Sequence, residues 1–180
     1  ARRREMQLGL SSTIFSASTE DDRHFLNGLL WKYEKDTFSL VATDGRRLAI
    51  TSTRKVKAKK EFRVIVPSKI LGELASYLAG LKGKEEEEVT VGLSSNQIGF
   101  RTGKTVFISR LVEGNFPAFE QIIPKSHEIE ILINAEKLLA VTKRAAICCN
   151  ERSGAVKYTF KKDALVVNSA SQSMDFEDEL

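Results

Sequence analysis

The sequence predicts an α+β fold in which helices pack on antiparallel β-sheets and one structural unit is used more than once. Three observations lead to this prediction. Three segments carry apolar residues at helical spacing, alternating apolar and polar runs lie between them, and a stretch near residue 36 recurs 127 positions later. With 180 residues, of which 42% are apolar and 29% charged, the chain has a globular composition and is long enough for more than one small unit.

The three helical segments have recognisable boundaries. The first covers 4–17, with the apolar positions 6, 10 and 14 on one side. The second starts at Pro67, which suits a first helical turn, and ends at Gly80 and Gly83. Its apolar stripe consists of Ile70, Leu74, Tyr77, Leu78 and Leu81. The third begins after Asn134, a residue type that commonly caps helix N-termini.

Alternating segments predict the strands. They lie at 29–33, 37–43, 47–53, 62–66, 89–92, 97–101, 105–111, 130–133, 156–160, 164–169 and 173–179. The strongest hairpin signal is Asp44-Gly45, which lies between two of these segments. A two-residue type I′ turn needs positive φ at both central positions, and Asp-Gly tolerates this, so we expect such a turn here.

A weak repeat relates the two ends of the chain. Segment 33–40 (Tyr-Glu-Lys-Asp-Thr-Phe-Ser-Leu) matches segment 160–167 (Phe-Lys-Lys-Asp-Ala-Leu-Val-Val), and the helical segments match at nearly the same shift. Glu130 is therefore expected to begin a second copy whose first strand is 130–133, whereas the first copy has no strand ahead of its helix. We expect domains at 1–125 and 126–180, both cut from a larger repeating protein.

Charge is distributed unevenly along the chain. The net charge of +4 is compatible with nucleic-acid binding but is not diagnostic of it. Residues 55–60 form a cationic run and residues 85–88 an anionic one, and runs of this kind usually mark solvated loops. No apolar run approaches about 18 residues and no signal peptide is recognisable, so we expect no membrane segment.

Nothing in the sequence points to catalysis. Cys148 and Cys149 are adjacent, which suits neither a routine disulfide nor a metal clip and suggests reduced, intracellular thiols. His24 and His127 are the only histidines, so a zinc site is not expected. The sequence has no phosphate loop and no HExxH, GxSxG or CxxC motif, and the carboxylates at 21, 22 and 36 suit loops better than a metal site. We therefore expect no enzyme activity, no cofactor and no metal.

Five segments, in order and at matching spacing, resemble those of the bacterial sliding clamps, the β subunits of replicative DNA polymerase. Segment 41–50 (Val-Ala-Thr-Asp-Gly-Arg-Arg-Leu-Ala-Ile) resembles the family's Ala-Thr-Asp-Gly-His-Arg-Leu-Ala. Segment 23–28 (Arg-His-Phe-Leu-Asn-Gly) resembles Arg-Tyr-Tyr-Leu-Asn-Gly, and 64–69 (Val-Ile-Val-Pro-Ser-Lys) resembles Val-Ile-Val-Pro-Arg-Lys. Segment 111–117 (Leu-Val-Glu-Gly-Asn-Phe-Pro) resembles Leu-Val-Asp-Gly-Arg-Phe-Pro, and 144–147 (Arg-Ala-Ala-Ile) also matches.

The resemblance implies a DNA-clamp fold, with 1–125 as the middle unit and 126–180 as the front of the last one. A clamp subunit carries three units, and two subunits close head to tail into a ring around duplex DNA. The implied role is a non-catalytic processivity factor of DNA polymerase in the bacterial cytoplasm. The implied partners are duplex DNA, the polymerase catalytic subunit, the clamp loader, other proteins with a clamp-binding linear motif, and a second full-length subunit.

Basic residues on the predicted helices are candidates for facing DNA, because a sliding protein needs weak phosphate contacts that do not read sequence. They are Arg2, Arg3, Arg4, Lys69, Lys82, Lys137, Lys143 and Arg144. The resemblance adds Arg23, His24 and Phe25, which stand where the family has Arg-Tyr-Tyr near DNA. Two tyrosines are replaced, so the family's hydroxyl groups are missing at these positions.

The resemblance also implies a hydrophobic cleft between the middle and last units, in which apolar linear motifs dock. Its walls, carried over by motif, are Leu26, Thr43, Gly45, Arg46, Arg47, Leu48, Pro117 and Ile122. Gly45 lets a peptide backbone approach, the apolar side chains supply area to bury, and the arginines can meet carboxyl or carbonyl groups at the rim. Arg46 replaces the family's histidine, and Gln121 stands at a usually polar or basic position.

Two further expectations complete the interpretation. Ile147 and Cys148 match the face through which the family's last unit closes the ring.

The alternative function is a freestanding basic α+β module that binds nucleic acid by electrostatics alone. That module would bind duplex DNA strongly with a steep salt dependence, whereas a clamp fragment would bind weakly.

Overall fold

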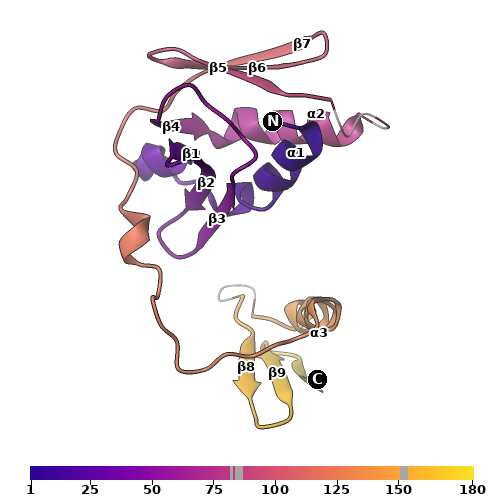
Figure 1. The fold of residues 1–180 in the computed structure, drawn as a ribbon. Coiled ribbons are helices and arrows are strands. Elements are labelled where there is room, and N and C mark those ends of the chain that lie inside the picture. The colour runs from indigo at the N-terminus through magenta and orange to yellow at the C-terminus, as the bar shows by residue number, and fades with distance from the viewer. Residues whose placement is uncertain (82, 84–86, 151–153) are drawn as a thin grey trace. The chain divides into compact units, whose positions relative to one another are not determined.

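The computed structural model describes residues 1–81, 83, 87–150 and 154–180, and Figure 1 shows its ribbon. Two compact units divide the chain, Ala1–Ile123 (unit 1) and Pro124–Leu180 (unit 2). Of the residues singled out above, Lys82, Glu85 and Glu86 lie outside the described part, as do the side chains of Asp21 and Asp22. Within the described chain, no helix is both long and apolar enough to cross a membrane.

Unit 1 combines antiparallel sheets with a pair of helices, α1 (Arg3–Ser11) and α2 (Ser68–Gly80). One sheet has the order β3-β2-β1-β4, built from β1 (Gly28–Glu34), β2 (Thr37–Thr43), β3 (Leu48–Thr53) and β4 (Phe62–Pro67). The other has the order β5-β6-β7, built from β5 (Thr90–Leu93), β6 (Gln97–Thr102) and β7 (Thr105–Arg110). Short 3₁₀ helices are η1 (Ile14–Ser16), η2 (Asp21–Leu26) and η3 (Phe119–Gln121).

The main core of unit 1 is made by both sheets and both helices. Trp31 of β1 is 1% exposed, and its ring lies edge-on to Phe38 at 5.2 Å and to Phe100 of β6 at 5.4 Å. Leu74 and Leu78 of α2 belong to the same cluster and are fully buried. Burial of this kind is the main source of stability, at about 1.5–3 kcal/mol for each large apolar side chain.

A second, smaller cluster lies on the opposite face of the four-stranded sheet, because neighbouring strand residues point to opposite sides. Its buried members are Leu30, Val41, Ile65, Phe116 and Phe119, and its partly buried members are Phe25, Leu48 and Val112. Phe116 and Phe119 come from the segment after β7, so the cluster holds that segment against the sheet.

Unit 2 contains α3 (Ala135–Ile147) and a sheet of order β10-β9-β8, built from β8 (Lys157–Phe160), β9 (Leu165–Ala170) and β10 (Asp175–Glu179). The strand order repeats β3-β2-β1 of unit 1. Thr43 pairs with Leu48 in unit 1, and Ala170 pairs with Asp175, 127 positions later, in unit 2. The buried core is Val141, Ala145, Leu165 and Val167.

Several sequence-based boundaries are confirmed. Helix α2 begins directly after Pro67 and ends at Gly80. Asn134 caps α3, since its side-chain oxygen accepts a hydrogen bond of 3.0 Å from the Lys137 amide. The predicted β-strands of unit 1 are present with shifts of one or two residues at their ends.

The first helix is shorter than predicted. It ends at Ser11 rather than continuing to residue 17, and η1 follows. The hydroxyl groups of three consecutive residues donate to carbonyl oxygens four residues earlier: Ser11 to Gln7, Ser12 to Leu8 and Thr13 to Gly9. Side-chain bonds of this kind compete with the helical ladder, which explains the early end.

The strand predicted at 130–133 is wrong. These residues are in no strand, and Leu132 is 102% exposed. The apolar alternation at 129, 131 and 133 has the right period, but a strand needs a neighbour for its backbone groups, and no strand of the described chain pairs with it.

The type I′ turn predicted at Asp44-Gly45 is also wrong. Thr43 pairs with Leu48, so four residues connect β2 and β3, and of these residues Gly45 alone has positive φ, at 90°. The two-residue turn with positive φ at both positions lies instead between β1 and β2, at Lys35 (50°) and Asp36 (59°).

Candidate functional site

The loop 44–47 is organised by the side chains of Thr43 and Asp44. The Thr43 hydroxyl donates to the Arg47 carbonyl at 2.7 Å and accepts from the Gly45 amide at 3.0 Å. Asp44 Oδ1 accepts from the amides of Arg46 (2.9 Å) and Arg47 (3.0 Å). These bonds satisfy the backbone donors that a tight turn would have paired across the strands, so they support a wider loop.

The Asp44 carboxylate is stabilised in its charged form. Hydrogen bonds from the backbone amides of Arg46 and Arg47, with the Arg47 guanidinium adding an ion pair of 3.1 Å, lower the pKa of Asp44 below its usual value. Donors directed at a carboxylate favour ionisation. The loop is therefore held by a carboxylate that stays charged at neutral pH.

Gly45 is favoured by the backbone conformation, and it lies close to the end of the Arg23 side chain. Its φ of +90° lies in a region that residues with a Cβ rarely adopt. An added Cβ would lie 2.9 Å from Nη1 of Arg23. Arg23 comes from η2, so the glycine lets two segments that are distant in sequence approach. The sequence-based role for Gly45, close approach of a backbone, is compatible with this geometry.

The residues predicted to line the groove differ in accessibility. Leu26 and Thr43 are buried, at 2% and 4% exposure, whereas Gly45, Arg46, Arg47 and Pro117 are exposed. Leu48 is half-buried and packs in the second apolar cluster with Phe25 and Phe119. Ile122 is 66% exposed. Unit 1 thus presents an apolar side chain at Leu48 next to an exposed pair of arginines.

Phe15, a neighbour of this loop, was not identified in the sequence analysis. Phe15 is 57% exposed, and the guanidinium carbon of Arg47 lies 5.8 Å from the centre of its ring, a cation–π geometry. Both residues line a cavity of about 490 Å³ that also includes Lys69 and Glu73 of α2. An aromatic residue within the first helical segment carries no local signal of exposure, so the pattern alone could not identify it.

The candidates for facing DNA fall into two groups. Arg4 of α1, His24 of η2 and Lys69 of α2 are exposed. Arg3 differs from the expectation, because it is only 4% exposed and its guanidinium donates to the Leu78 carbonyl of α2. A helical residue on the inner side of its helix cannot reach a ligand, so Arg3 does not belong to the exposed surface of α1.

Arg23 and Phe25 are also partly engaged inside unit 1. Arg23 pairs with Glu20 at 3.2 Å. Phe25 packs in the second apolar cluster and meets the His24 ring edge-on at 5.9 Å. An added Cβ at Gly114 would lie 3.2 Å from the Phe25 Cβ, so the glycine makes room for this aromatic side chain.

Helix α3 of unit 2 carries the remaining candidates. Ile147, its last residue, is 74% exposed, and Cys148 follows as the C-cap with intermediate exposure. Lys137, Lys143 and Arg144 are exposed. Arg144 forms an ion pair with Asp178 of β10, and that hydrogen bond is the main reason the pKa of Asp178 is lowered. Among the described residues, no group of three or more potential metal ligands is found.

The chain matches known proteins along most of its length. Residues 3–118 match the family model described as DNA polymerase III beta subunit, central domain. The beta sliding clamp of Salmonella typhimurium is 32% identical over 171 residues, covering 95% of this chain and 46% of that protein. The beta sliding clamp of Bacillus subtilis is 30% identical over 154 residues, covering 84% of this chain and 40% of that protein.

Solved structures show the same fold. The DNA polymerase III subunit beta of Pseudomonas aeruginosa superposes on the whole of this chain with a TM-score of 0.90 and 28% identity, using 49% of its own length. A second structure of that bacterium's sliding clamp, bound to griselimycin, gives a TM-score of 0.88 over 48% of its length. The chain therefore spans about half the length of the proteins that it matches.

Proposed function

This chain belongs to the DNA polymerase III beta subunit family, the bacterial sliding clamps, and we propose that it supplies the central domain and the first part of the C-terminal domain of such a clamp. In this proposal 1–125 is the central domain and 126–180 begins the next one. The family match over 3–118 and the recurrence of three strands at a shift of 127 residues support this division. The proposed activity is that of the complete clamp subunit.

The proposed activity is non-catalytic: the complete subunit, as a ring of two copies in the bacterial cytoplasm, encircles duplex DNA and tethers the replicative polymerase to it. No cofactor is needed for such a role. Retention of the full-length protein on nicked circular DNA, compared with linear DNA, tests the tether. Rapid loss from linear DNA and persistence on circles is expected, and equal retention on both would contradict encirclement.

The observation that carries the binding function is the loop 44–47. It presents Arg46 and Arg47 beside Leu48, and Leu48 continues into the apolar cluster of Phe25 and Phe119. An apolar patch with a cationic rim suits a short peptide that ends in apolar residues and has a free carboxylate or exposed carbonyls. We infer that replication proteins with a clamp-binding linear motif dock here, with Leu26, Thr43, Gly45, Pro117 and Ile122 completing or supporting the groove.

Charge reversal at the groove tests this part of the proposal. Leu48→Glu and Arg47→Glu are expected to abolish capture of a polymerase-derived motif peptide, measured by fluorescence anisotropy, because they remove an apolar contact or invert the rim. Motif peptides of this kind bind at about micromolar Kd, or roughly −8 kcal/mol. The matched controls are Ile108→Glu and Arg101→Glu, both exposed on the second sheet. Undiminished binding by a folded Leu48→Glu protein would place the groove elsewhere.

The remaining surfaces complete the proposal. Arg4, Arg23, His24 and Lys69 supply weak phosphate contacts to DNA in the ring, and Phe25 supports this region from within unit 1. Ile147 and Cys148 belong to the face that closes the ring, and the 74% exposure of Ile147 supports a surface that is covered in the assembled protein.

The freestanding basic module is not favoured as an alternative. The family match covers residues 3–118, and the similarity to complete clamps extends through unit 2. A salt titration of the 180-residue chain with duplex DNA separates the two functions, since a freestanding module requires strong binding on its own.

A further inference from the structure

The positive charge of this protein is concentrated in one loop. Residues 54–61 connect β3 to β4, and the first seven of them, 54–60 (Arg-Lys-Val-Lys-Ala-Lys-Lys), contain five Lys or Arg and no acid. The other 173 residues hold 23 Lys and Arg against 24 Asp and Glu, because the whole chain has 28 and 24. Without this loop the chain would therefore carry no excess of positive charge, and its net charge of +4 is a property of the loop.

The loop is anchored rather than loosely solvated. Val56 and Ala58 are partly buried and pack against the main core of unit 1, while Lys55, Lys57 and Lys59 are exposed. Apolar and cationic side chains thus alternate between the inside and the outside.

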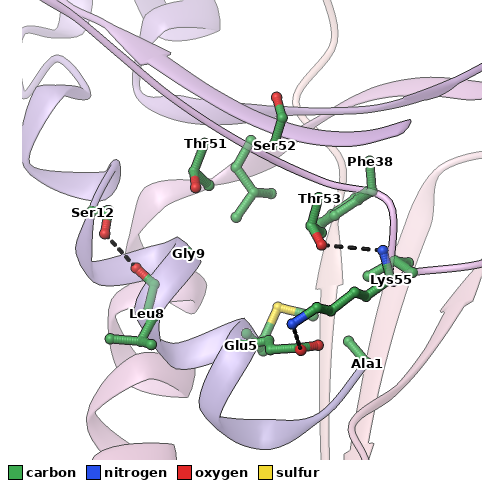
Figure 2. A pocket seen from close by; sticks show the side chains of 13 residues that line it. Ala1, Glu5, Leu8, Gly9, Ser12, Phe38, Thr51, Ser52, Thr53 and Lys55 are labelled. Carbon is green, nitrogen blue, oxygen red and sulfur yellow. Dashed lines mark hydrogen bonds and ion pairs between the residues drawn. The ribbon is translucent and has the colours of Figure 1, made fainter. Parts of the chain in front are cut away.

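Two acids pair with lysines of the loop and neutralise part of its charge, and a third, Glu61, directly follows it. Lys55 pairs with Glu5 of α1 at 3.2 Å, as the dashed line in Figure 2 shows, and Lys57 pairs with Asp36 at 3.4 Å. Glu61 accepts a bond of 3.0 Å from the Lys35 amide. No described acid lies within 4.0 Å of the cationic groups of Arg54, Lys59 or Lys60, so these three charges are available to a partner.

We propose that loop 54–60 is a sequence-independent contact for the phosphate backbone of nucleic acid, separate from the peptide groove and from the helix surface. Val56 and Ala58 are partly buried against the core, so the exposed surface of the loop is mainly cationic, which suits a phosphate backbone better than a protein partner that needs apolar anchors. The groove loop 44–47 precedes β3 and loop 54–60 follows it, so the two lie at opposite ends of that strand.

Neutralising the loop tests this inference in the 180-residue chain. The variant Lys59→Gln/Lys60→Gln is compared with the control Lys104→Gln/Lys125→Gln, which removes the same charge from exposed sites elsewhere. Binding to a fluorescein-labelled mixed-sequence duplex is measured by anisotropy between about 50 and 200 mM salt. The loop variant is expected to reduce the slope of log K against log salt by about one for each phosphate-bound lysine, and the control to leave it unchanged.

Each outcome decides the inference. Equal slopes for the loop variant and the control would overturn it, provided that circular dichroism shows both to be folded. Competition by polyglutamate as effective as that by DNA of equal charge would assign the loop to acidic peptides and would also overturn it. The assay uses the 180-residue chain, so its outcome does not depend on ring formation. The variant Arg4→Gln/Lys69→Gln tests the helix surface separately. Loss of DNA binding in this variant, with full binding by the loop variant, would assign the DNA contact to the helix surface and refute the proposal for loop 54–60.

Discussion

Units 1 and 2 contain the same hairpin in two different surroundings. Trp31 and Tyr33 of β1 are 1% and 5% exposed, whereas Tyr158 and Phe160, 127 positions later in β8, are 37% and 53% exposed. The second strand of the hairpin is buried in both units: Phe38 and Leu40 of β2 are buried, and so are Leu165 and Val167 of β9. The difference lies in what covers the aromatic positions.

In unit 1 a second sheet covers the hairpin. Phe100 of β6 supplies the ring against which Trp31 packs, and α2 adds Leu74 and Leu78 to the same cluster. In unit 2 the described elements are α3 and three strands, and the core consists of four small or medium side chains. The comparison shows that this hairpin does not make a core by itself, because a sheet buries its apolar side chains only against a second layer.

Removing the cover over Trp31 has the largest expected effect. Phe100→Ala should lower the free energy of unfolding of unit 1 by about 3–5 kcal/mol, through loss of buried area and the cavity left behind. Trp31 is the only tryptophan, so its fluorescence in a urea titration follows unit 1 alone. Phe160→Ala in unit 2 should leave that transition within about 0.5 kcal/mol. Equal costs for the two variants would break the comparison.

A smaller effect is expected where the two units connect their second and third strands. Gly45 and Gln172 occupy matching positions, 127 residues apart, but only the glycine has positive φ among these two. Gly45→Ala should cost about 1–3 kcal/mol because of backbone strain at φ +90°. Gln172→Ala should be nearly neutral. Denaturation followed by far-ultraviolet circular dichroism measures both, and a neutral Gly45→Ala would remove the conformational argument for this loop.

The two loops should also respond differently to acid, which is the smallest of the expected effects. Asp44 accepts from the amides of residues two and three positions later, and Ser171 does the same with its hydroxyl, at 3.4 Å to Ser173 and 3.1 Å to Met174. Because the pKa of Asp44 is lowered on folding, its contribution is present above the unfolded-state value and is lost as pH falls through the folded-state pKa. The Ser171 loop has no such group.

Amide hydrogen exchange read by NMR checks this contrast. On acidification, the protection of the Arg46 and Arg47 amides, corrected for intrinsic rates, should fall while that of Ser173 and Met174 stays constant. Asp44→Asn keeps an acceptor oxygen but removes the charge, so it should abolish the pH dependence at 46 and 47. A parallel loss of protection in both loops would point to general unfolding instead.

Much of the fold could be predicted from local chemistry. Alternation located the strands, Pro67 and Gly80 delimited α2, and Asn134 marked the start of α3, since each of these signals acts through the residue itself or its near neighbours. The failures had non-local causes. The strand at 130–133 lacked a described partner, and the first helix ended early because three hydroxyl groups compete with its own backbone.

The candidate site could be predicted in position but not in detail. The Asp44-Gly45 hairpin is present, but its turn type depended on whether Thr43 and Asp44 would satisfy the backbone. The resemblance implied Leu26 as a groove wall and Phe25 as a residue near DNA, whereas Leu26 is 2% exposed and Phe25 packs with Phe116 and Phe119, and this burial depends on residues distant in the sequence. Phe15 was missed because exposure of an aromatic residue is decided by its surroundings.

Arg3 has one further consequence for how unit 1 behaves mechanically. Its backbone amide donates to the Glu87 carbonyl at 2.8 Å, and its guanidinium donates to Leu78, in the last turns of α2. A permanently charged side chain thus links the start of α1 to the end of α2 by a hydrogen bond. This is the end of α2 at which the helix dipole favours a cation. We therefore expect a shift of either helix at this end to move the other with it.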